Sequence, residues 1–262
     1  MHPLEADTWS ALKRQAITQV EQEPILSGHL YDLILRHRGY AEALAYLIAS
    51  SLSNQVFSLA GMNDLIGETI TRHPEIASFS LDDLAAVTTR DPASECSLVP
   101  FLYYKGFKGL QAHRVAHALW TEGRKGVARF LQSRVADSLA IDIHPAARIG
   151  RGVFMDHGIG LVIGETSVVE DDVSILQSVT LGGTGKESGD RHPKIRRGVM
   201  IGAGAKILGN IEVGEGSKVA AGSVVLKSVP PHTTVAGVPA VTVGALHSET
   251  PAFDMKQDID PD

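Results

Sequence analysis

Residues 195–229 read IRRGVMIGAGAKILGNIEVGEGSKVAAGSVVLKSV, and an aliphatic residue recurs at every sixth position. These positions are Ile195, Ile201, Ile207, Val213, Val219 and Val225. An α-helix repeats at about 3.6 residues and a β-strand at about 2, so neither explains a sustained period of six. The pattern predicts short strands separated by corners, which stack the aliphatic residues into one continuous column.

The same period begins upstream at Ile143 and is interrupted twice before the quoted segment. It is kept from Ile143 to Met155 and resumes at Ile163, two residues late. The two additional residues therefore fall in the segment that carries Asp156 and His157. A displaced corner of this kind is where a regular scaffold can present a functional side chain.

A second interruption separates Leu181 from Ile195 by fourteen positions, where two intact repeats would take twelve. The residues between them are polar and rich in glycine, and few of them could fill a packed column. We expect an extended loop at about residues 183–194, because loops that leave a rigid scaffold often carry function.

The composition divides the 262 residues into two domains. Eighteen of the 26 glycines lie within 143–244, whereas both tryptophans precede that range. Residues 1–140 place apolar side chains at helical spacing and predict an all-α domain that serves assembly or acts as a cap. Residues 141–246 form the repeat domain, and residues 247–262 are an acidic, unpatterned tail expected to be disordered.

Charge and cysteine content exclude several classes of protein. The net charge of -6, without a basic block, argues against a nucleic-acid partner. Cys96 is the single cysteine, which excludes a disulfide framework and a cysteine-based zinc site. No apolar run approaches the roughly 20 residues of a membrane helix, and the first residues lack the features of a signal peptide, which predicts a cytoplasmic protein without a membrane partner.

Two features of the helical half have competing interpretations. Asp91 before Pro92 suits the start of a helix, since aspartate caps free N–H groups and proline is tolerated at the first helical position. His113 and His117 are one helical turn apart, a spacing that can hold a metal. No third ligand is evident, so a structural role is the favoured interpretation and no metal site is predicted.

Several strings of residues resemble the serine O-acetyltransferase family of bacterial cysteine synthesis. They are TRDPA at 89–93, YKGF at 104–107, DIHPAA at 142–147, DHG at 156–158, GET at 164–166, ILQSVTLGGTGK at 175–186 and GDRHPKI at 189–195. The resemblance implies an α+β fold with two domains, in which an N-terminal helical domain precedes a left-handed parallel β-helix of hexapeptide repeats that carries the catalytic site. It also implies trimers that pair into a homohexamer through the helical domains.

The activity implied is transfer of the acetyl group of acetyl-CoA to the hydroxyl of L-serine, the first step of cysteine synthesis. His157 is the predicted general base, because an imidazole titrates near neutral pH and this one lies where the repeat is displaced. The resemblance gives Asp142 as the partner that orients His157. The two positions are fifteen residues apart, close to one circuit of three six-residue sides, so they could stack.

Binding of L-serine requires groups for its ammonium and its carboxylate. The resemblance assigns the ammonium to Asp91 and Asp156 and the carboxylate to Arg191 and His192; for the latter pair a solvated loop is the alternative. Four further positions are expected to bind acetyl-CoA, with a backbone N–H of the glycine-rich turn available to the thioester oxygen. These are Gly183, Ala203, Lys218 and Ala221.

Three alternative functions stay open. A related acetyltransferase could use a sugar or an antibiotic as its acceptor. A β-helix of the carbonic anhydrase type would need zinc ligands, for which His144, His157, His192 and His232 are available. The protein could also be chiefly a scaffold for a partner enzyme.

Two further partners are considered, L-cysteine because it is L-serine with sulfur in place of oxygen, and cysteine synthase because of the resemblance. L-Cysteine is expected to compete with L-serine as a feedback inhibitor. The family's tail commonly ends in an isoleucine that enters the active site of cysteine synthase. Here Ile259 is followed by Asp260, Pro261 and Asp262, a departure that weighs against this complex.

Overall fold

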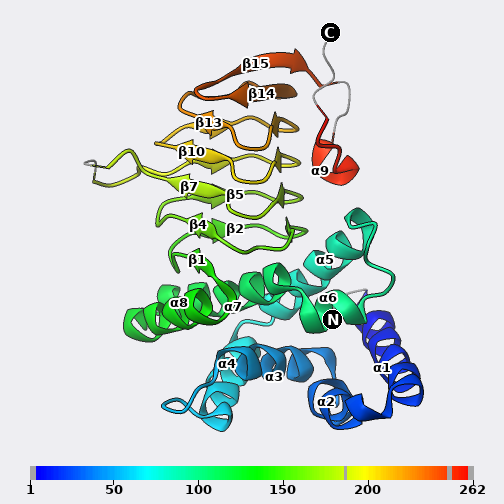
Figure 1. The fold of residues 1–262 in the computed structure, drawn as a ribbon. Helices are drawn as coiled ribbons and strands as arrows, with labels where there is room; N and C mark the ends of the chain where they lie inside the picture. Colours follow the sequence, from blue (N-terminus) through cyan, green and yellow to red (C-terminus); the bar gives the residue numbers. More distant parts are fainter. Residues whose placement is uncertain (1–3, 186–187, 247–249, 259–262) are drawn as a thin grey trace.

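The computed structural model describes residues 4–185, 188–246 and 250–258, and it consists of a triangular coil of short strands on a helical base (Figure 1). The elements of the helical base are α1 (Glu5–Gln22), a 3₁₀ turn (Pro24–Leu26), α2 (Ser27–Leu30), a π turn (Tyr31–Leu35), α3 (Tyr40–Leu52), α4 (Leu59–Arg72), α5 (Glu75–Arg90), α6 (Leu98–Tyr103), α7 (Lys105–Thr121) and α8 (Lys125–Leu139). The coil begins two residues after α8. This is the predicted α+β architecture, a helical region followed by a left-handed parallel β-helix.

Successive strands of the coil belong to three different sheets, whose strands are parallel except for β15 (Ala240–Ala245) at the end of sheet C. Sheet A has the order β1 (Ile141–Ile143), β4 (Leu161–Ile163), β7 (Thr180–Gly182), β10 (Lys206–Leu208), β13 (Val224–Val225). Sheet B has the order β11 (Glu212–Val213), β8 (Lys194–Ile195), β5 (Val168–Val169), β2 (Arg148–Ile149). Sheet C has the order β15 (Ala240–Ala245), β14 (Thr233–Gly237), β12 (Lys218–Val219), β9 (Met200–Ile201), β6 (Ser174–Ile175), β3 (Phe154–Met155).

The predicted aliphatic column is formed by residues that pair from coil to coil. In sheet A, Ile143 pairs with Ile163, Ile163 with Leu181, Leu181 with Ile207 and Ile207 with Val225. All five side chains are buried. Burial of a continuous apolar column is the main driving force for this fold.

The pairing of strands also shows how many residues each of the two interruptions adds to the coil. A regular circuit takes 18 residues, from Ile163 to Leu181, while the circuit from Ile143 to Ile163 takes 20, as the displaced repeat predicts. The circuit from Leu181 to Ile207 takes 26. Leu181 in β7 and Ile195 in β8 lie on successive sides of the triangle, so the loop adds eight residues to one repeat. The sequence-based estimate of two was wrong because it assumed that one further side lay between these markers.

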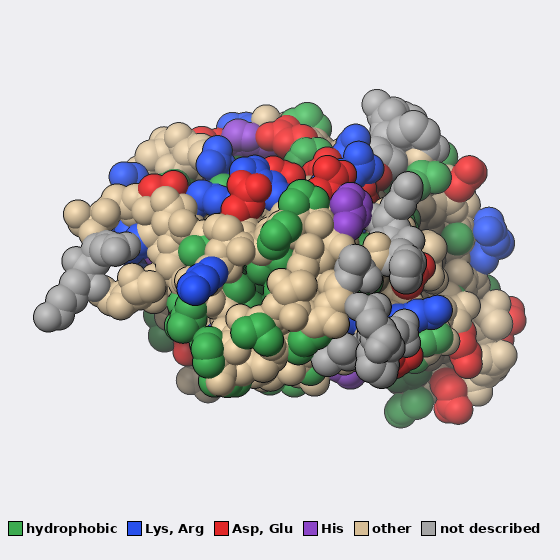
Figure 2. Space-filling model, turned by 90° about the horizontal axis from the view of Figure 1, so that it is seen from above, with side chains coloured by type: hydrophobic (Ala, Val, Ile, Leu, Met, Phe, Trp, Pro, Cys, Tyr) green, Lys and Arg blue, Asp and Glu red, His purple; other side chains and the backbone are tan. Residues whose placement is uncertain are grey.

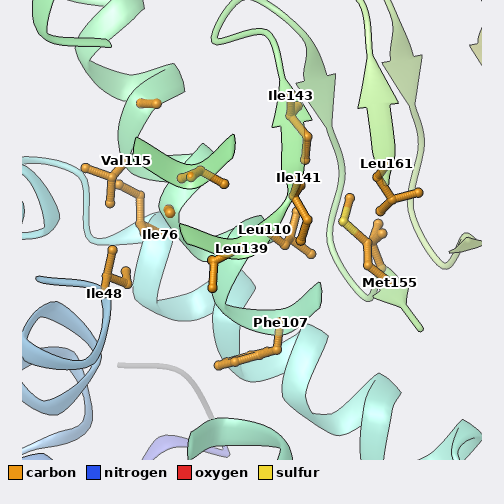
Figure 3. Packing of buried hydrophobic residues seen from close by; sticks show 14 of the residues in the cluster. Ile48, Ile76, Phe107, Leu110, Val115, Leu139, Ile141, Ile143, Met155 and Leu161 are labelled. Carbon is orange, nitrogen blue, oxygen red and sulfur yellow. The ribbon is translucent and has the colours of Figure 1, made fainter. Parts of the chain in front are cut away.

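The helical and coil regions share one hydrophobic core. Figure 3 shows Leu110 of α7 beside Ile141 of β1, and both are buried in the same cluster as Leu139 of α8. Gly106 brings α7 close to the coil, because a Cβ on this residue would lie 1.9 Å from the carbonyl oxygen of Met155. The first coil is therefore positioned directly by α7.

The C-terminal segment differs from the expected disordered tail. The short helix α9 (Pro251–Asp254) buries Ala252 beside sheet C, and the Ser174 hydroxyl donates to the Ala252 carbonyl over 2.8 Å. The guanidinium carbon of Arg90 lies 4.1 Å from the centre of the Phe253 ring. These contacts order the segment despite its polar composition; residues 247–249 and 259–262 lie outside the described residues.

Charged side chains are interspersed on the surface of the coil. Figure 2 shows Lys and Arg side chains beside Asp and Glu on the face that it presents. Arg196, for example, bridges Glu170 and Glu212. Among the described residues, no helix is both long enough and apolar enough to cross a membrane.

Candidate active site

His157 occupies the corner at which the coil passes from β3 in sheet C to β4 in sheet A. Its backbone is left-handed, with a φ of 55°, and the following Gly158 has a φ of 77°. The Gly160 amide donates to the Ala140 carbonyl over 2.7 Å, which folds the enlarged corner against the start of β1. The His157 side chain is 69% exposed, so the two additional residues present an imidazole to incoming molecules.

The carboxylate of Asp156 lies beside this imidazole, and that of Asp91 acts on Asp156. The Asp156 carboxylate is 3.8 Å from Nε2 of His157. Burial raises the pKa of Asp156, the charge of His157 opposes that rise, and the negative charge of Asp91 adds to it. The α5 helix and the β3 corner therefore bring Asp91 and Asp156 close enough to repel each other, an arrangement that a cation between them would relieve.

Tyr104 is a member of this group that the sequence did not single out. Its hydroxyl donates to Oδ2 of Asp91 over 2.8 Å. Burial, this hydrogen bond and the charges of Asp91 and Asp156 raise the pKa of Tyr104 to about 12, so the phenol stays protonated and holds Asp91 in place. Only its position in the string at 104–107 could have suggested it.

Asp91 does not start a helix, which corrects one of the two interpretations of the Asp-Pro pair. It caps the C-terminus of α5, where its amide donates to the Val87 carbonyl, and the next helix begins at Leu98. Its Oδ1 accepts a hydrogen bond from the Ala93 amide over 2.9 Å. This turn and Tyr104 fix the carboxylate at the junction of the helical base and the coil.

Asp142, the predicted partner of His157, lies on β1 next to the same corner. Its Oδ1 accepts a hydrogen bond from Nε2 of Gln132 in α8 over 2.7 Å. The hydrogen bonds and ion pairs of the described residues do not join Asp142 to His157 directly. Gln132 therefore holds the carboxylate, and the pairing of Asp142 with His157 stays a prediction.

Arg191 and His192 form a second group at the base of the extended loop. Thr166 organises it: its hydroxyl accepts from the Arg191 and His192 amides, each over 3.1 Å, and lies 2.9 Å from Nδ1 of His192. The Arg191 guanidinium donates to Oε2 of Glu165 over 2.8 Å. His192 is buried against Gly164, and this burial lowers its pKa. These contacts contradict the alternative of a freely solvated loop base.

The two groups lie at opposite ends of the strands of sheet A, that is, at two different corners of the triangular coil. The His157 corner joins sheet C to sheet A, whereas the loop with Arg191 joins sheet A to sheet B between β7 and β8. A single copy of the chain therefore brings Asp91, Asp156 and His157 together but leaves Arg191 and His192 at another corner of the coil.

The positions expected to bind acetyl-CoA are divided in the same way. Ala203 and Ala221 occupy two later corners from sheet C to sheet A, between β9 and β10 and between β12 and β13, and the Gly222 amide donates to the Ala203 carbonyl over 2.8 Å. Gly183 lies at the start of the loop, where a Cβ added to it would lie 3.5 Å from the Arg191 carbonyl oxygen. Lys218 is buried in sheet C, and its ammonium contacts the Asp258 carbonyl of the C-terminal segment.

The imidazoles considered for zinc do not form a metal centre with each other. Within the described residues, no group of three or more His, Cys, Asp or Glu side chains has the arrangement of a metal site. His144 instead packs edge-on against Trp120, with ring centres 5.0 Å apart.

The parallel coil of hexapeptide repeats, with an exposed imidazole at an enlarged corner, defines a transferase of the hexapeptide class. A profile for bacterial transferase hexapeptide repeats matches residues 192–227, and one for the N-terminal part of serine acetyltransferase matches residues 8–112. The chain belongs to the serine acetyltransferase family. Its members are acyltransferases.

Individual relatives cover nearly the whole chain. Serine acetyltransferase of Escherichia coli K12 is 53% identical over 249 residues, which are 95% of this chain and 91% of that protein. The enzyme of Haemophilus influenzae is 50% identical over 96% of this chain and 94% of its own length. The crystal structure of the Vibrio cholerae enzyme superposes with a TM-score of 0.96 at 52% identity, covering 98% of this chain and 99% of that one.

Proposed function

We propose that the protein moves the acetyl group of acetyl-CoA to the hydroxyl of L-serine and releases CoA and O-acetyl-L-serine. The single observation that carries the mechanism is the exposed His157 beside Asp156, a carboxylate that is repelled by the charge of Asp91. The ammonium of serine supplies the cation that this pair requires, and binding it places the serine hydroxyl near the imidazole.

His157 takes the hydroxyl proton as the oxygen attacks the thioester carbon. The carbon–sulfur bond then breaks, and the proton on His157 passes to the leaving thiolate of CoA. Asp142 orients the imidazole in this scheme, which requires its carboxylate to turn from Gln132 toward His157 when the substrates bind. A backbone N–H at Gly183 stabilises the negative oxygen of the intermediate.

The serine carboxylate is bound by Arg191 and His192 of a neighbouring copy in this proposal. The support is geometric, because the two groups occupy the two corners of the coil on either side of sheet A. Copies arranged around a three-fold axis would therefore bring each loop to its neighbour's His157 corner. A groove between neighbours also places Gly183 of one copy opposite Ala203 and Ala221 of the next. Pairing of two such trimers through the helical bases gives the homohexamer.

Two related structures support the ligands. A serine acetyltransferase from Brucella abortus, 51% identical with a TM-score of 0.90 over 92% of this chain and 96% of that one, was solved in complex with coenzyme A. Another, 49% identical with a TM-score of 0.95, is described as a complex with cysteine. Cysteine carries the ammonium and carboxylate of serine, so it fits the same groups and acts as a feedback inhibitor. The cytoplasmic location, the helical assembly role and the weakened case for a complex with cysteine synthase stay predictions.

Complementation between two variants, both assayed with L-serine well below its KM so that each is impaired, tests the shared site. His157→Ala and Arg191→Ala are purified separately, unfolded together in denaturant and refolded as mixed assemblies, and release of the CoA thiol is measured with L-serine. Random mixing in a ring should restore about a quarter of the wild-type activity, because a site needs an intact His157 from one copy and an intact Arg191 from its neighbour. Recovery no greater than that of the separately refolded variants would place both residues in one copy. A parallel assay with sugar acceptors separates this activity from that of other hexapeptide transferases.

A further inference from the structure

His192 is held at the base of the extended loop in a way that fixes where its proton lies. The Thr166 amide donates to Nδ1 of His192 over 3.2 Å. A backbone N–H can only donate, so Nδ1 presents its lone pair and the proton of the neutral imidazole is on Nε2. The fold therefore selects one tautomer of His192.

The surroundings of His192 also keep its imidazole neutral. Burial lowers its pKa most, and the charges of Arg191, Lys194 and His144 act in the same direction. The Glu165 carboxylate raises this pKa, but Arg191 already engages that carboxylate over 2.8 Å. Protonation would also place a second N–H at Nδ1, opposite the amide that donates there. The ring is therefore a neutral group between charged neighbours.

The Thr166 hydroxyl fixes the orientation of the ring relative to the loop. Its oxygen accepts from the Arg191 and His192 amides, each over 3.1 Å, which uses both of its lone pairs. The hydroxyl proton is left for Nδ1 of His192, 2.9 Å away, and for Asp190. Lys194 and, less strongly, this hydroxyl lower the pKa of Asp190. One side chain thus orders the loop base and the imidazole together.

Gly164 supplies the surface on which the ring lies. A Cβ at this position would lie 2.1 Å from both Nε2 and Cδ2 of His192, and the three atoms nearest to it would all belong to this imidazole. Gly164 does not have a positive φ, so its backbone conformation is open to alanine. A methyl group here would therefore displace the ring without straining the chain.

Nε2 is the atom of His192 that can contact a substrate. Within the described residues no hydrogen bond engages it, and it keeps contact with solvent, because the fully buried side-chain atoms without a partner lie in other residues. Nε2 can donate its proton to an acceptor, but it has no lone pair with which to take the proton of a hydroxyl. Of the two imidazoles assigned to the site, His157 alone can then act as the base.

We propose that Thr166 and Gly164 are positioning residues that hold His192 as a neutral Nε2–H donor to the serine carboxylate. This inference rests on the proposed acetylation of L-serine. The two residues act through the imidazole and need no contact with the substrate. A neutral donor binds a carboxylate equally well on both sides of neutral pH, whereas an imidazolium would lose its charge as the pH rises.

Steady-state kinetics of CoA thiol release test the role of the hydroxyl. Thr166→Val should raise the KM for L-serine about tenfold, as expected for a weakened hydrogen bond to a charged group, and should keep kcat within about threefold because His157 is unchanged. Thr166→Ser retains the hydroxyl, so its KM should stay within about twofold of the wild-type value. Thr233→Val is the matched control, since that hydroxyl donates to the Pro231 carbonyl in the last circuit of the coil; it should change neither constant.

Gly164→Ala tests the position of the ring by itself. It should raise the KM for L-serine about tenfold with kcat retained. The ratio of the variant KM to the wild-type KM should change by less than about twofold between about pH 7 and about pH 8.5. An imidazolium that paired with the carboxylate would be lost over this range, and the ratio would fall toward one.

The inference is overturned by an unchanged KM in both Thr166→Val and Gly164→Ala, by a loss confined to kcat, or by a KM ratio that falls toward one at the higher pH. A failure of Thr166→Ser to restore the KM would also overturn it. Wild-type protein that releases no CoA thiol with L-serine would instead refute the proposed function, so the two failures are distinguishable.

Discussion

The buried ion pair between Asp83 in α5 and Arg114 in α7 is expected to be a main support of the junction below the active site. The Arg114 guanidinium donates to Oδ2 of Asp83 over 2.7 and 3.0 Å, and also to the Gly150 carbonyl over 2.6 Å. Asp83 additionally accepts from the Gln111 side chain and from the Val153 amide of the first coil. Both charged side chains are almost fully buried.

Asp83→Leu should therefore lower the free energy of unfolding by about 4 kcal/mol. Removing one partner of a buried pair typically costs about 3–5 kcal/mol, because the remaining charge is left uncompensated. The cost of losing the hydrogen bonds from Gln111 and Val153 is already part of that range, so it is not added separately. The double variant Asp83→Leu with Arg114→Leu should recover about half of the loss, since it buries no unpaired charge.

Urea unfolding followed by circular dichroism, at one fixed protein concentration, measures these differences. Arg197→Gln, which breaks an exposed pair with Asp172, is the control and should cost less than about 1 kcal/mol. The reasoning fails if Asp83→Leu costs less than about 1 kcal/mol, or if the double variant loses the sum of the two single losses.

Four further predictions concern the active site and the helical base. His157→Ala should reduce turnover by a factor on the order of a hundred or more with an unchanged oligomer by light scattering, and normal turnover would refute its role as base. Arg191→Ala should raise the KM for L-serine by about tenfold or more, and a rise confined to acetyl-CoA would contradict the assignment. L-Cysteine should raise the apparent KM for L-serine without changing kcat, so a lowered kcat alone would argue against a shared site. Hydrogen bonds to Glu122 and Glu75 raise the pKa of His73, so they stabilise the fold below the unfolded value of about 6.5 and cease to do so as the pH rises through the folded value. Glu122→Gln should accordingly lower the melting temperature more at about pH 6 than at about pH 8.5, and an NMR titration that finds the His73 pKa unraised would remove the basis for this.

The fold was largely predictable because a period of six is a property of the local sequence. Each aliphatic marker had to face one column, and the pairing of Ile143, Ile163 and Leu181 follows from that requirement. The size of the extended loop was less accessible, since a gap in a periodic signal does not reveal how many sides of the triangle it spans. The order of α9 was also missed, because it depends on contacts with Arg90 and Ser174 that no local pattern encodes.

The site was predictable as a set of residues but not as an arrangement. The displaced repeat indicated His157, while Tyr104 and Thr166 appeared only as members of the quoted strings, and the folded chain shows that they hold Asp91 and His192. The resemblance placed Arg191 with the same substrate as Asp156. The resemblance contained no information on which corner of the coil Arg191 and Asp156 would each occupy, since that depends on how many corners of the coil separate the two residues.

The antiparallel strand β15 has a consequence for how copies of this protein can associate. It pairs with β14, the last parallel strand of sheet C, so the edge of that sheet is an antiparallel strand that does not continue the parallel coil. The other end of the coil rests on α7 and α8 (Figure 1). A coil left open at both ends would invite end-to-end stacking into fibres. With its ends obstructed, this one can recruit further copies through its flanks, and lateral contacts that close on themselves limit the size of the assembly.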